Sequence, residues 1–260
     1  MPADAVVTGL PPEPNRPGIA LVTGASRGIG RACARALAAA GWDLRLVART
    51  ADALQDLAAG LPGGGHRHLP ADLATPAGRL ALVDWIGDGL PDAIVQCLGG
   101  ASSPSADDDP WQAAMRLNFH SVVAIDEWFL PRFVERGSGA IVHLSSSAAV
   151  HGRAFTPYSC AKAALNCYVT SRGRECLRSH VVVSGLMPPA VDGDGNDWSI
   201  AAAADPVRYQ RMRQGQALGR AMTTDEVAAV VAFLCGPAGG VFGGCVIPAD
   251  AMISVRGEFV

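Results

Sequence analysis

The sequence lacks the charge pattern of a nucleic-acid-binding protein. Its 260 residues contain 21 lysines and arginines against 24 aspartates and glutamates, which gives a formal charge of -3. No basic run interrupts this balance. Because nucleic-acid surfaces need clustered positive charge, we expect no nucleic-acid partner. The composition favours a small uncharged or anionic metabolite.

Long apolar runs and an export signal are absent too. No apolar stretch approaches the ~18 residues that span a bilayer, and no charged segment followed by an apolar one opens the chain. These absences predict a cytoplasmic protein without membrane contact. Prolines crowd residues 1–17, which we predict to be a flexible leader.

Paired cysteines are also missing. The seven cysteines are an odd number and include no C-x-x-C pair, which is typical of reduced thiols rather than of disulfides or a zinc site. His66 and His68 have no third ligand at a suitable spacing, so no metal is expected. Cysteines in helix-like segments are expected to be small buried hydrophobic residues. These are Cys33, Cys160, Cys167, Cys176 and Cys235.

What the sequence does contain is a regular alternation of short apolar runs and helix-like segments. This alternation is typical of a parallel sheet with helices on both faces. Since the composition shows no break, residues 18–260 are predicted to form one doubly wound α/β domain with a seven-stranded parallel sheet. The predicted strands are Ile19–Val22, Leu44–Val47, His68–Pro70, Ala93–Leu98, Ala140–Leu144, Val181–Leu186 and Cys245–Pro248.

A glycine-rich turn follows the first predicted strand and opens into a helix. It reads Thr23-Gly24-Ala25-Ser26-Arg27-Gly28-Ile29-Gly30. Gly24 permits a tight reversal, Gly28 lets a pyrophosphate approach the backbone, and Gly30 lets the helix lie close to the sheet. The start of the helix offers free N–H groups to phosphates. The turn indicates a dinucleotide site in a fold of the Rossmann type, although an ordinary strand-to-helix turn also contains glycines.

A second segment places Tyr158 and Lys162 four residues apart on a predicted helix, where the two side chains share one face. A phenol with a pKa of about 10 exchanges protons poorly at neutral pH unless a nearby ammonium stabilises its phenolate. The preceding strand ends in serines 145–147, whose hydroxyls could orient a substrate oxygen. Alone, such a pair is more often a solvated helix face. Its interpretation as a catalytic pair therefore depends on the dinucleotide turn in the same chain.

Together, the glycine turn and the Tyr158-x-x-x-Lys162 pair resemble the compact branch of the short-chain dehydrogenase/reductase family, over roughly residues 17–248. The resemblance implies that Tyr158 is the general acid/base and that Lys162 lowers its pKa and binds the nicotinamide ribose. It also implies that Asn118 distorts the central helix and holds a water in a proton relay.

The resemblance implies a catalytic serine without fixing which one. The strand end Ala140–Leu144 aligns Ser146 with the family serine, whereas the usual separation of thirteen residues from the tyrosine points to Ser145. We favour Ser146, because strand register fixes a side-chain direction while the following loop can lose a residue.

The resemblance also implies where the cofactor binds. Asp72 would bind the adenine amino group, although by itself it is equally a helix N-cap. Val191 would place a backbone amide against the nicotinamide carboxamide. The residues expected to bind the cofactor are Gly24, Ser26, Arg27, Gly28, Ile29, Gly30, Arg49, Asp72, Leu73, Gly99, Tyr158, Lys162, Pro188 and Val191.

The end of the second predicted strand indicates which cofactor is used. An acidic residue there accepts the ribose hydroxyls of NAD and would repel the phosphate of NADP. Ala48 occupies this position, Arg49 follows it, and Arg27 can point to the same spot. Because a guanidinium matches phosphate oxygens, the two arginines favour NADP(H) and carbonyl reduction as the direction.

Several segments depart from the family pattern. Gln96-Cys97-Leu98-Gly99 stands in place of Asn-Asn-Ala-Gly, and Pro189 stiffens the turn after the sixth strand. Gly193 cannot donate the hydroxyl that the family offers to the diphosphate. Asp250-Ala251-Met252 replaces Asp-Gly-Gly. These changes bear on cofactor geometry more than on chemistry.

The sequence therefore predicts an NADPH-dependent reductase of a ketone or aldehyde in which Tyr158 protonates the oxygen. One alternative is a cofactor-binding sensor or structural protein without catalysis, and another is a redox-neutral dehydratase or epimerase. The resemblance implies a homo-oligomer, a tetramer or dimer, built on the helices around Asn118 and Tyr158.

A substrate lid is expected around residues 192–218, where glycines flank an aromatic residue. Trp198, Tyr209 and Met212 are its candidate pocket walls. The competing interpretation is a helix that packs on the core.

Overall fold

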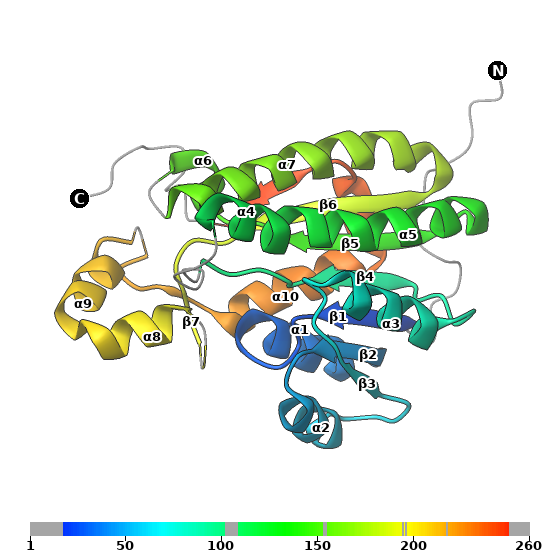
Figure 1. Cartoon of the computed structure of the whole chain (residues 1–260), viewed down its shortest axis with the longest axis horizontal. Coiled ribbons are helices and arrows are strands. Elements are labelled where there is room, and N and C mark those ends of the chain that lie inside the picture. The colour runs from blue at the N-terminus through cyan, green and yellow to red at the C-terminus, as the bar shows by residue number, and fades with distance from the viewer. Residues whose placement is uncertain are drawn as a thin grey trace.

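The computed structural model describes residues 18–101, 109–152, 155–193, 195, 197–216 and 218–249. Its centre is a sheet of strand order β3-β2-β1-β4-β5-β6-β9 in which every neighbouring pair is parallel. The strands are β1 (Ile19–Thr23), β2 (Asp43–Ala48), β3 (Arg67–Pro70), β4 (Ala93–Gln96), β5 (Gly139–Leu144), β6 (Val181–Met187) and β9 (Val246–Pro248). The predicted doubly wound α/β fold is confirmed (Figure 1).

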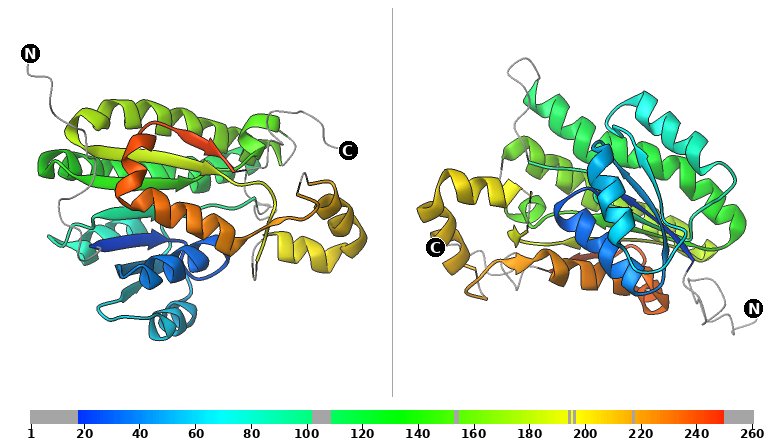
Figure 2. Two further views of the ribbon diagram at one scale, coloured as in Figure 1. Left: turned by 180° about the vertical axis from the view of Figure 1, so that it is seen from behind. Right: turned by 90° about the horizontal axis from the view of Figure 1, so that it is seen from below.

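Helices connect the strands and cover both faces of the sheet (Figure 2). They are α1 (Gly28–Ala39), α2 (Ala51–Gly60), α3 (Pro76–Ile86), α4 (Pro110–Met115), α5 (Ser121–Arg136), α6 (Ala148–His151), α7 (Thr156–Cys176), α8 (Asp197–Ala204), α9 (Pro206–Gln214) and α10 (Thr224–Cys235). A π-helical turn, Arg116–His120, joins α4 to α5, and 3-10 turns span Leu177–Ser179 and Pro237–Phe242.

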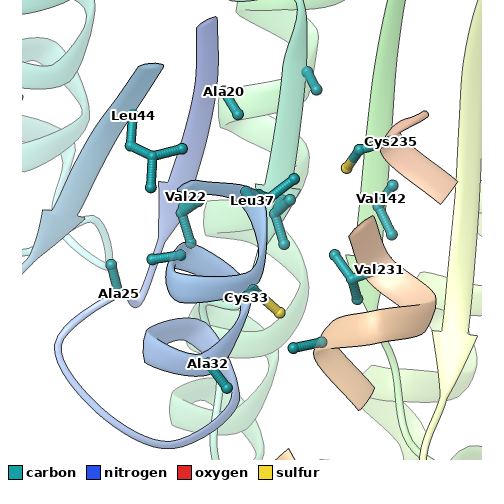
Figure 3. Packing of buried hydrophobic residues seen from close by; sticks show 14 of the residues in the cluster. Ala20, Val22, Ala25, Ala32, Cys33, Leu37, Leu44, Val142, Val231 and Cys235 are labelled. Atoms are coloured by element: carbon teal, nitrogen blue, oxygen red, sulfur yellow. The ribbon is translucent and has the colours of Figure 1, made fainter. Parts of the chain in front are cut away.

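The strands send alternate side chains into two separate cores. On one face, Val22 packs with Leu37 of α1 and Val231 of α10 (Figure 3). On the other face, Leu21 packs in the core that contains Phe129 of α5. Because both faces are covered, the central strands β1, β4, β5 and β6 are buried along nearly their whole length and are mostly apolar on both sides. This explains why they appear in the sequence as short continuous apolar runs.

All the predicted strands are present, with differences at their ends. β4 ends at Gln96, two residues earlier than predicted, because the N–H groups of Cys97 and Leu98 donate to Thr23 Oγ1 instead of to a neighbouring strand. A separate parallel pair, β7 (Val191–Asp192) and β8 (Met222–Thr223), was not predicted. Strands of two residues are too short to show a periodic pattern.

The expectation that the helix cysteines are buried is partly wrong. Cys33, Cys176 and Cys235 are buried, whereas Cys160 and Cys167 are exposed on α7. α7 buries a stripe that includes Ala161, Leu165 and Val169 at four-residue spacing, and the two exposed cysteines lie off this stripe.

The segments that carry the predicted site follow the carboxyl ends of the strands. The chain leaves β1 into the glycine turn, β4 into Gly99, β5 into the serines 145–147 and β6 into Pro188. α8 and α9 lie beyond this edge (Figure 1). The strand order reverses between β1 and β4, which is where doubly wound folds bind ligands.

Some expectations fall outside the described residues. These are the leader 1–17, positions 194, 196 and 217 of the expected lid, and the segment Asp250–Met252. Within the described part of the chain, no helix combines the length and hydropathy that a membrane span requires.

Candidate active site

The glycine turn has a backbone shape that excludes side chains at its tightest points. Gly24 has φ +64°, and a Cβ atom there would lie 2.7 Å from the carbonyl oxygen of Cys97. A Cβ atom on Gly30 would lie 2.2 Å from the carbonyl oxygen of Gly24. Ser26 and Ile29 are half-buried between these glycines. The turn therefore holds α1 close to the ends of β1 and β4, as expected for a dinucleotide turn.

The N-terminus of α1 has no side-chain cap. Arg27 occupies the N-cap position without a capping hydrogen bond, and α1 begins at Gly28, which has φ +53°. Several other helices are capped by side chains, namely those of Thr75, Asp109, Asp205 and Thr223. The uncapped N–H groups of α1 and the glycine cradle fit the diphosphate of a dinucleotide.

α7 brings Tyr158 and Lys162 together as their spacing predicts. Lys162 Nζ lies 5.8 Å from the centroid of the Tyr158 ring and donates a 2.8 Å hydrogen bond to the carbonyl oxygen of Leu144. Burial lowers the pKa of Lys162 from 10.5 to about 8, because desolvation penalises the ammonium. Tyr158 is half-buried. The ammonium is thus fixed beside the phenol by the end of β5.

Asn118 lies in the π-helical turn between α4 and α5, so the predicted helix distortion is confirmed. Its Oδ1 accepts a 3.0 Å hydrogen bond from Gly100 N, and its Nδ2 donates to Gly100 O at 3.1 Å. A Cβ atom on Gly99 would lie 2.7 Å from Asn118 Oδ1 and 3.1 Å from Lys162 Nζ. Gly99, Asn118 and Lys162 therefore meet at one point, and π-turns are frequent at functional sites.

The serines after β5 differ in what their hydroxyls do. Ser145 is buried, and its Oγ donates to Asn166 Oδ1. Ser147 is buried, with its Oγ 3.1 Å from His151 Nε2. Ser146 is half-buried, and its Oγ accepts a 3.1 Å hydrogen bond from the backbone N–H two residues later. That bond uses an acceptor site of Ser146 and leaves its hydroxyl proton for another partner.

The predicted adenine and carboxamide residues differ in exposure. Asp72 is exposed, and its Oδ1 accepts a 3.0 Å hydrogen bond from Ala74 N. Thr75 rather than Asp72 caps α3, so the alternative interpretation of Asp72 as the N-cap is wrong. The Leu73 side chain is buried in the core, which leaves only its backbone for a ligand. Val191 is also buried and begins β7.

Arg27 and Arg49, the predicted phosphate ligands, are exposed at the carboxyl edge. Arg27 Nη1 donates a 2.6 Å hydrogen bond to the carbonyl oxygen of Gly195, so the glycine turn contacts the segment after β7. The carbonyl oxygen of Pro188 accepts a 3.0 Å hydrogen bond from Ser147 N. This bond joins the ends of β5 and β6 beside the site.

The helices α8 and α9 of the expected lid stand apart from the core. Tyr209 donates its hydroxyl to Asp192 of β7, and Arg213 Nε lies 3.1 Å from the same carboxylate. Trp198 and Ile200 are exposed. Neither core cluster includes a described residue of α8 or α9. The interpretation as a helix packed on the core therefore receives no support.

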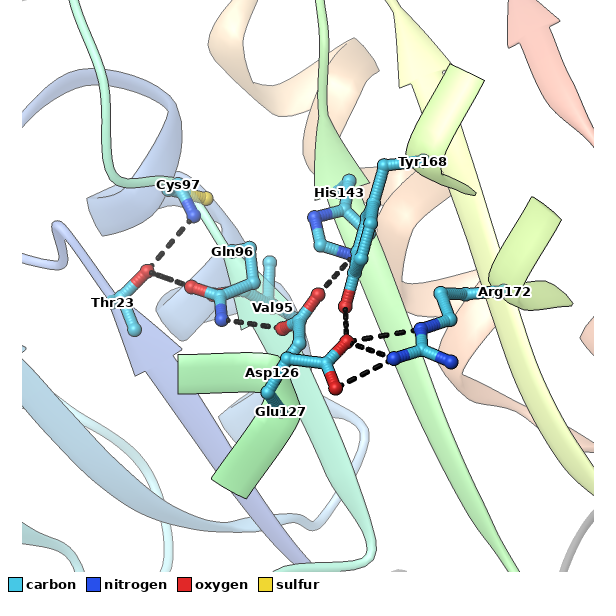
Figure 4. A network of polar contacts seen from close by, with 9 residues as sticks. All are labelled: Thr23, Val95, Gln96, Cys97, Asp126, Glu127, His143, Tyr168 and Arg172. Carbon is cyan, nitrogen blue, oxygen red and sulfur yellow. Dashed lines mark hydrogen bonds and ion pairs between the residues drawn. The ribbon is translucent and has the colours of Figure 1, made fainter. Parts of the chain in front are cut away.

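Sequence reasoning missed a buried polar cluster behind β4. Gln96 was noted only as a departure from the family, and Asp126 and His143 were not considered, yet their side chains meet in the interior (Figure 4). The signal that could have found them was the presence of polar residues inside otherwise apolar strands, because buried polar groups need partners.

A hollow of about 280 Å³ lies at the opposite, amino edge of the sheet. It is lined by Gly87, Asp88, Leu90, Arg132, Glu135 and Arg136. Arg136 is already engaged by the carbonyl oxygen of Pro91 at 2.9 Å and by Asp92 at 3.4 Å. None of the predicted site residues lines this hollow. Among the described residues, no group of three or more histidine, cysteine or acidic side chains is placed to hold a metal ion.

Comparison with known proteins identifies the family of this site. Residues 18–202 match the family model described as short chain dehydrogenase. The chain belongs to the short-chain dehydrogenase family. A rhamnolipids biosynthesis 3-oxoacyl-[acyl-carrier-protein] reductase from Pseudomonas aeruginosa is 31% identical over 245 residues, which is 89% of this chain and 94% of that protein.

Solved short-chain dehydrogenase structures share the fold. L-sorbose reductase from Gluconobacter frateurii, complexed with NADPH and L-sorbose, is 28% identical with a TM-score of 0.82, over 91% of this chain and 96% of that chain. The NADP active-site complex of RhlG from Pseudomonas aeruginosa is 28% identical with a TM-score of 0.82, over 92% and 97%. The chain thus belongs to a family of oxidoreductases that use nicotinamide cofactors.

Proposed function

We propose that this protein is an NADP(H)-dependent reductase that converts a ketone or aldehyde to an alcohol, or catalyses the reverse reaction. The observation that carries the proposal is the meeting of Tyr158, Lys162 and Asn118 beside Gly99. This group lies at the sheet edge that also carries the uncapped start of α1. A proton-transfer group and a phosphate cradle at one edge are what carbonyl reduction with a dinucleotide requires.

The chain's own residues account for the cofactor. The glycine turn would hold the diphosphate, Asp72 the adenine and Lys162 the nicotinamide ribose. When bound, the nicotinamide supplies or accepts the hydride. Arg27 and Arg49 support NADP(H), because they offer guanidiniums to a phosphate where an NAD-dependent protein needs a carboxylate. The NADPH and NADP in the L-sorbose reductase and RhlG structures agree with this choice.

The proton chemistry belongs to Tyr158. Its hydroxyl gives a proton to the carbonyl oxygen during reduction and takes it back in the reverse direction. The Lys162 ammonium stabilises the phenolate, and each unit by which it lowers the pKa of Tyr158 corresponds to about 1.4 kcal/mol. The lysine is held for this task by the carbonyl oxygen of Leu144.

Ser146 is the serine that we assign to the substrate oxygen. The hydroxyl of Ser145 is committed to Asn166, and that of Ser147 faces His151. Ser146 keeps a hydroxyl proton that can be donated to a carbonyl oxygen and so polarise it.

The remaining parts of the proposal concern the whole chain. We propose one catalytic domain over residues 18–260, with a lid around 192–218 that covers a small-molecule substrate. The exposed Trp198 and the contact of Arg27 with Gly195 support a lid that adjoins the cofactor site. We also propose that the protein is a homo-oligomer, a tetramer or dimer, and that it acts in the cytoplasm.

A panel of ketones and aldehydes tests the proposal with NADPH and, separately, with NADH. We expect oxidation of NADPH with at least one substrate and a lower rate with NADH. Tight NADPH binding without turnover of any substrate would favour the sensor. Product formation without net consumption of cofactor would favour a dehydratase or epimerase. Both of these outcomes would contradict the reductase.

A further inference from the structure

One continuous chain of buried polar groups lies directly behind the candidate site (Figure 4). Thr23, Gln96 and His143 are neighbours in register at the ends of β1, β4 and β5. Asp126 reaches them from α5, and all four residues are buried. Because a buried charge or polar group is costly without its partners, this cluster holds its members in a defined geometry.

The hydrogen bonds of this polar cluster lead, one after another, to the carboxylate of Asp126. Asp126 Oδ1 accepts from Gln96 Nε2 at 2.9 Å, and Gln96 Oε1 accepts from Thr23 Oγ1 at 3.0 Å. Thr23 Oγ1 accepts in turn from the N–H groups of Cys97 at 3.1 Å and Leu98 at 3.2 Å. Thr23 thus uses its one donor and both acceptor sites. The negative charge of Asp126 orients and strengthens each following bond.

The second carboxylate oxygen of Asp126 faces β5. His143 Nε2 lies 3.0 Å from Asp126 Oδ2, a close polar contact without the alignment of a hydrogen bond. The Tyr168 ring packs edge-on against His143, with centroids 6.2 Å apart. The residue after His143 is Leu144, whose carbonyl oxygen holds Lys162 Nζ. The same carboxylate therefore acts on the strand end that fixes the lysine.

These contacts reach three segments of the site. The hydrogen-bond series ends at the backbone of Cys97, and the carbonyl oxygen of Cys97 limits the space at Gly24. The same hydrogen bonds fix the backbone that leads from β4 to Gly99, and Gly99 lies against Asn118 and Lys162. A shift of the β4 end would therefore move the glycine turn and the lysine together.

We propose that Asp126 is a positioning residue of the cofactor site. Through Gln96 and Thr23 on one side and His143 on the other, its buried carboxylate sets the relative positions of the turn after β1, the loop after β4 and the end of β5. This inference rests on the proposed function, since it concerns the binding of a dinucleotide.

Moving the negative charge from position 126 to position 96 tests this role. Asp126→Asn removes the carboxylate, and Gln96→Glu places a second carboxylate beside the first, at atoms that are now 2.9 Å apart. The double variant Asp126→Asn/Gln96→Glu moves the charge by one position. It again directs the Thr23 hydroxyl and the amide at position 126 toward a carboxylate. Glu127→Gln is the matched control, because Glu127 is the next residue on α5 and pairs with Arg172 at the surface.

Two readouts are taken on folded protein, after the melting temperature of each variant has been measured. One is the dissociation constant of NADP. The other is amide hydrogen exchange of the peptide that contains Cys97 and Leu98, in protein without cofactor. We expect Asp126→Asn to weaken NADP binding roughly tenfold and to speed exchange, because bonds to a charged partner are stronger than neutral ones. The double variant should return both quantities to near the wild-type values, and Glu127→Gln should change neither.

The proposal is overturned if Asp126→Asn leaves both readouts unchanged, or if the double variant binds NADP no better than Asp126→Asn. Failure of the double variant to fold, where Asp126→Asn folds, overturns it as well. If the wild-type protein binds neither NADP nor NAD, the proposed function fails. The exchange measurement still tests the positioning of the β4 end in that case, because it needs no cofactor.

Discussion

The inner and outer sides of the helical layer formed by α5 and α7 use charge differently. Asp126 and Lys162 are buried against the strand ends, where they contact His143 and the backbone of β5. Glu127 and Arg172, on the same two helices, form a surface ion pair at 2.6 Å. An exposed pair contributes about 0–1 kcal/mol, whereas a buried charge needs matched partners. The difference teaches that, on these two helices, the charges which shape the site are those that solvent does not reach.

The largest effect in this comparison concerns two cations of α7, the buried Lys162 and the surface Arg172. Lys162→Met should lower kcat for carbonyl reduction at least about a hundredfold, because the phenolate of Tyr158 loses its stabilising ammonium. Arg172→Met removes a cation from the outer side of the same helix and should leave kcat within about twofold of wild type. Steady-state oxidation of NADPH measures both. Equal losses in the two variants would show that the inner cation has no special role.

The second effect concerns stability against pH. The pKa of Lys162 is about 8 in the folded protein and 10.5 ordinarily, so the unfolded chain holds more protons between these values. The free energy of unfolding should therefore rise from about pH 8 to pH 10.5, by roughly 2 kcal/mol up to pH 10. Denaturant titrations of wild type and Lys162→Met measure this rise. The variant should lack it, and a parallel rise in both proteins would show that the burial of Lys162 is not its cause.

The third effect compares two glycines with positive φ. Gly99→Ala should weaken NADP binding about tenfold or more, because its Cβ atom would lie 2.7 Å from Asn118 Oδ1 and 3.1 Å from Lys162 Nζ. Gly137 has φ +73° with open space around it, so Gly137→Ala should cost about 1 kcal/mol of stability and no affinity. Calorimetric titration and thermal melts separate the two effects. Unchanged affinity in Gly99→Ala would remove Gly99 from the site.

The smallest effect concerns the choice of cofactor. Arg49→Ala should weaken NADP binding about fivefold and leave NAD binding unchanged, because only NADP carries the phosphate that the guanidinium matches. Arg45 lies earlier on β2, and its Nη1 donates to the carbonyl oxygen of Gly65, so Arg45→Ala should preserve the ratio of the two affinities. Titration with both dinucleotides gives this ratio. An equal loss for NAD and NADP in Arg49→Ala would point to a general rather than a phosphate-specific contact.

Features encoded by neighbouring residues could be predicted from the sequence. The glycine turn, the strands of the main sheet and the pairing of Tyr158 with Lys162 each depend on local spacing, and the structure contains all of them. A distortion of the helix at Asn118 was expected from the family resemblance alone, and the structure has a π-helical turn there.

Features that depend on register between distant segments could not be predicted. The contact of Gln96 with Asp126 joins positions 30 residues apart, and it requires α5 to lie over the ends of β4 and β5. The pair β7–β8 likewise joins two-residue strands that have no pattern of their own. The sequence also left Ser145 and Ser146 open, because what separates them is the bond of Ser145 to Asn166, which depends on how α7 packs on β5.

The most direct test of the account compares two tyrosines of α7. Tyr158→Phe should keep NADPH binding and lower turnover by orders of magnitude, because the proton donor is lost. Tyr168 is the control, since burial raises its pKa and its hydroxyl donates to Glu127 at 3.2 Å. Tyr168→Phe should retain turnover. Undiminished turnover in Tyr158→Phe, with NADPH bound as in wild type, would contradict the central claim that this phenol transfers the proton.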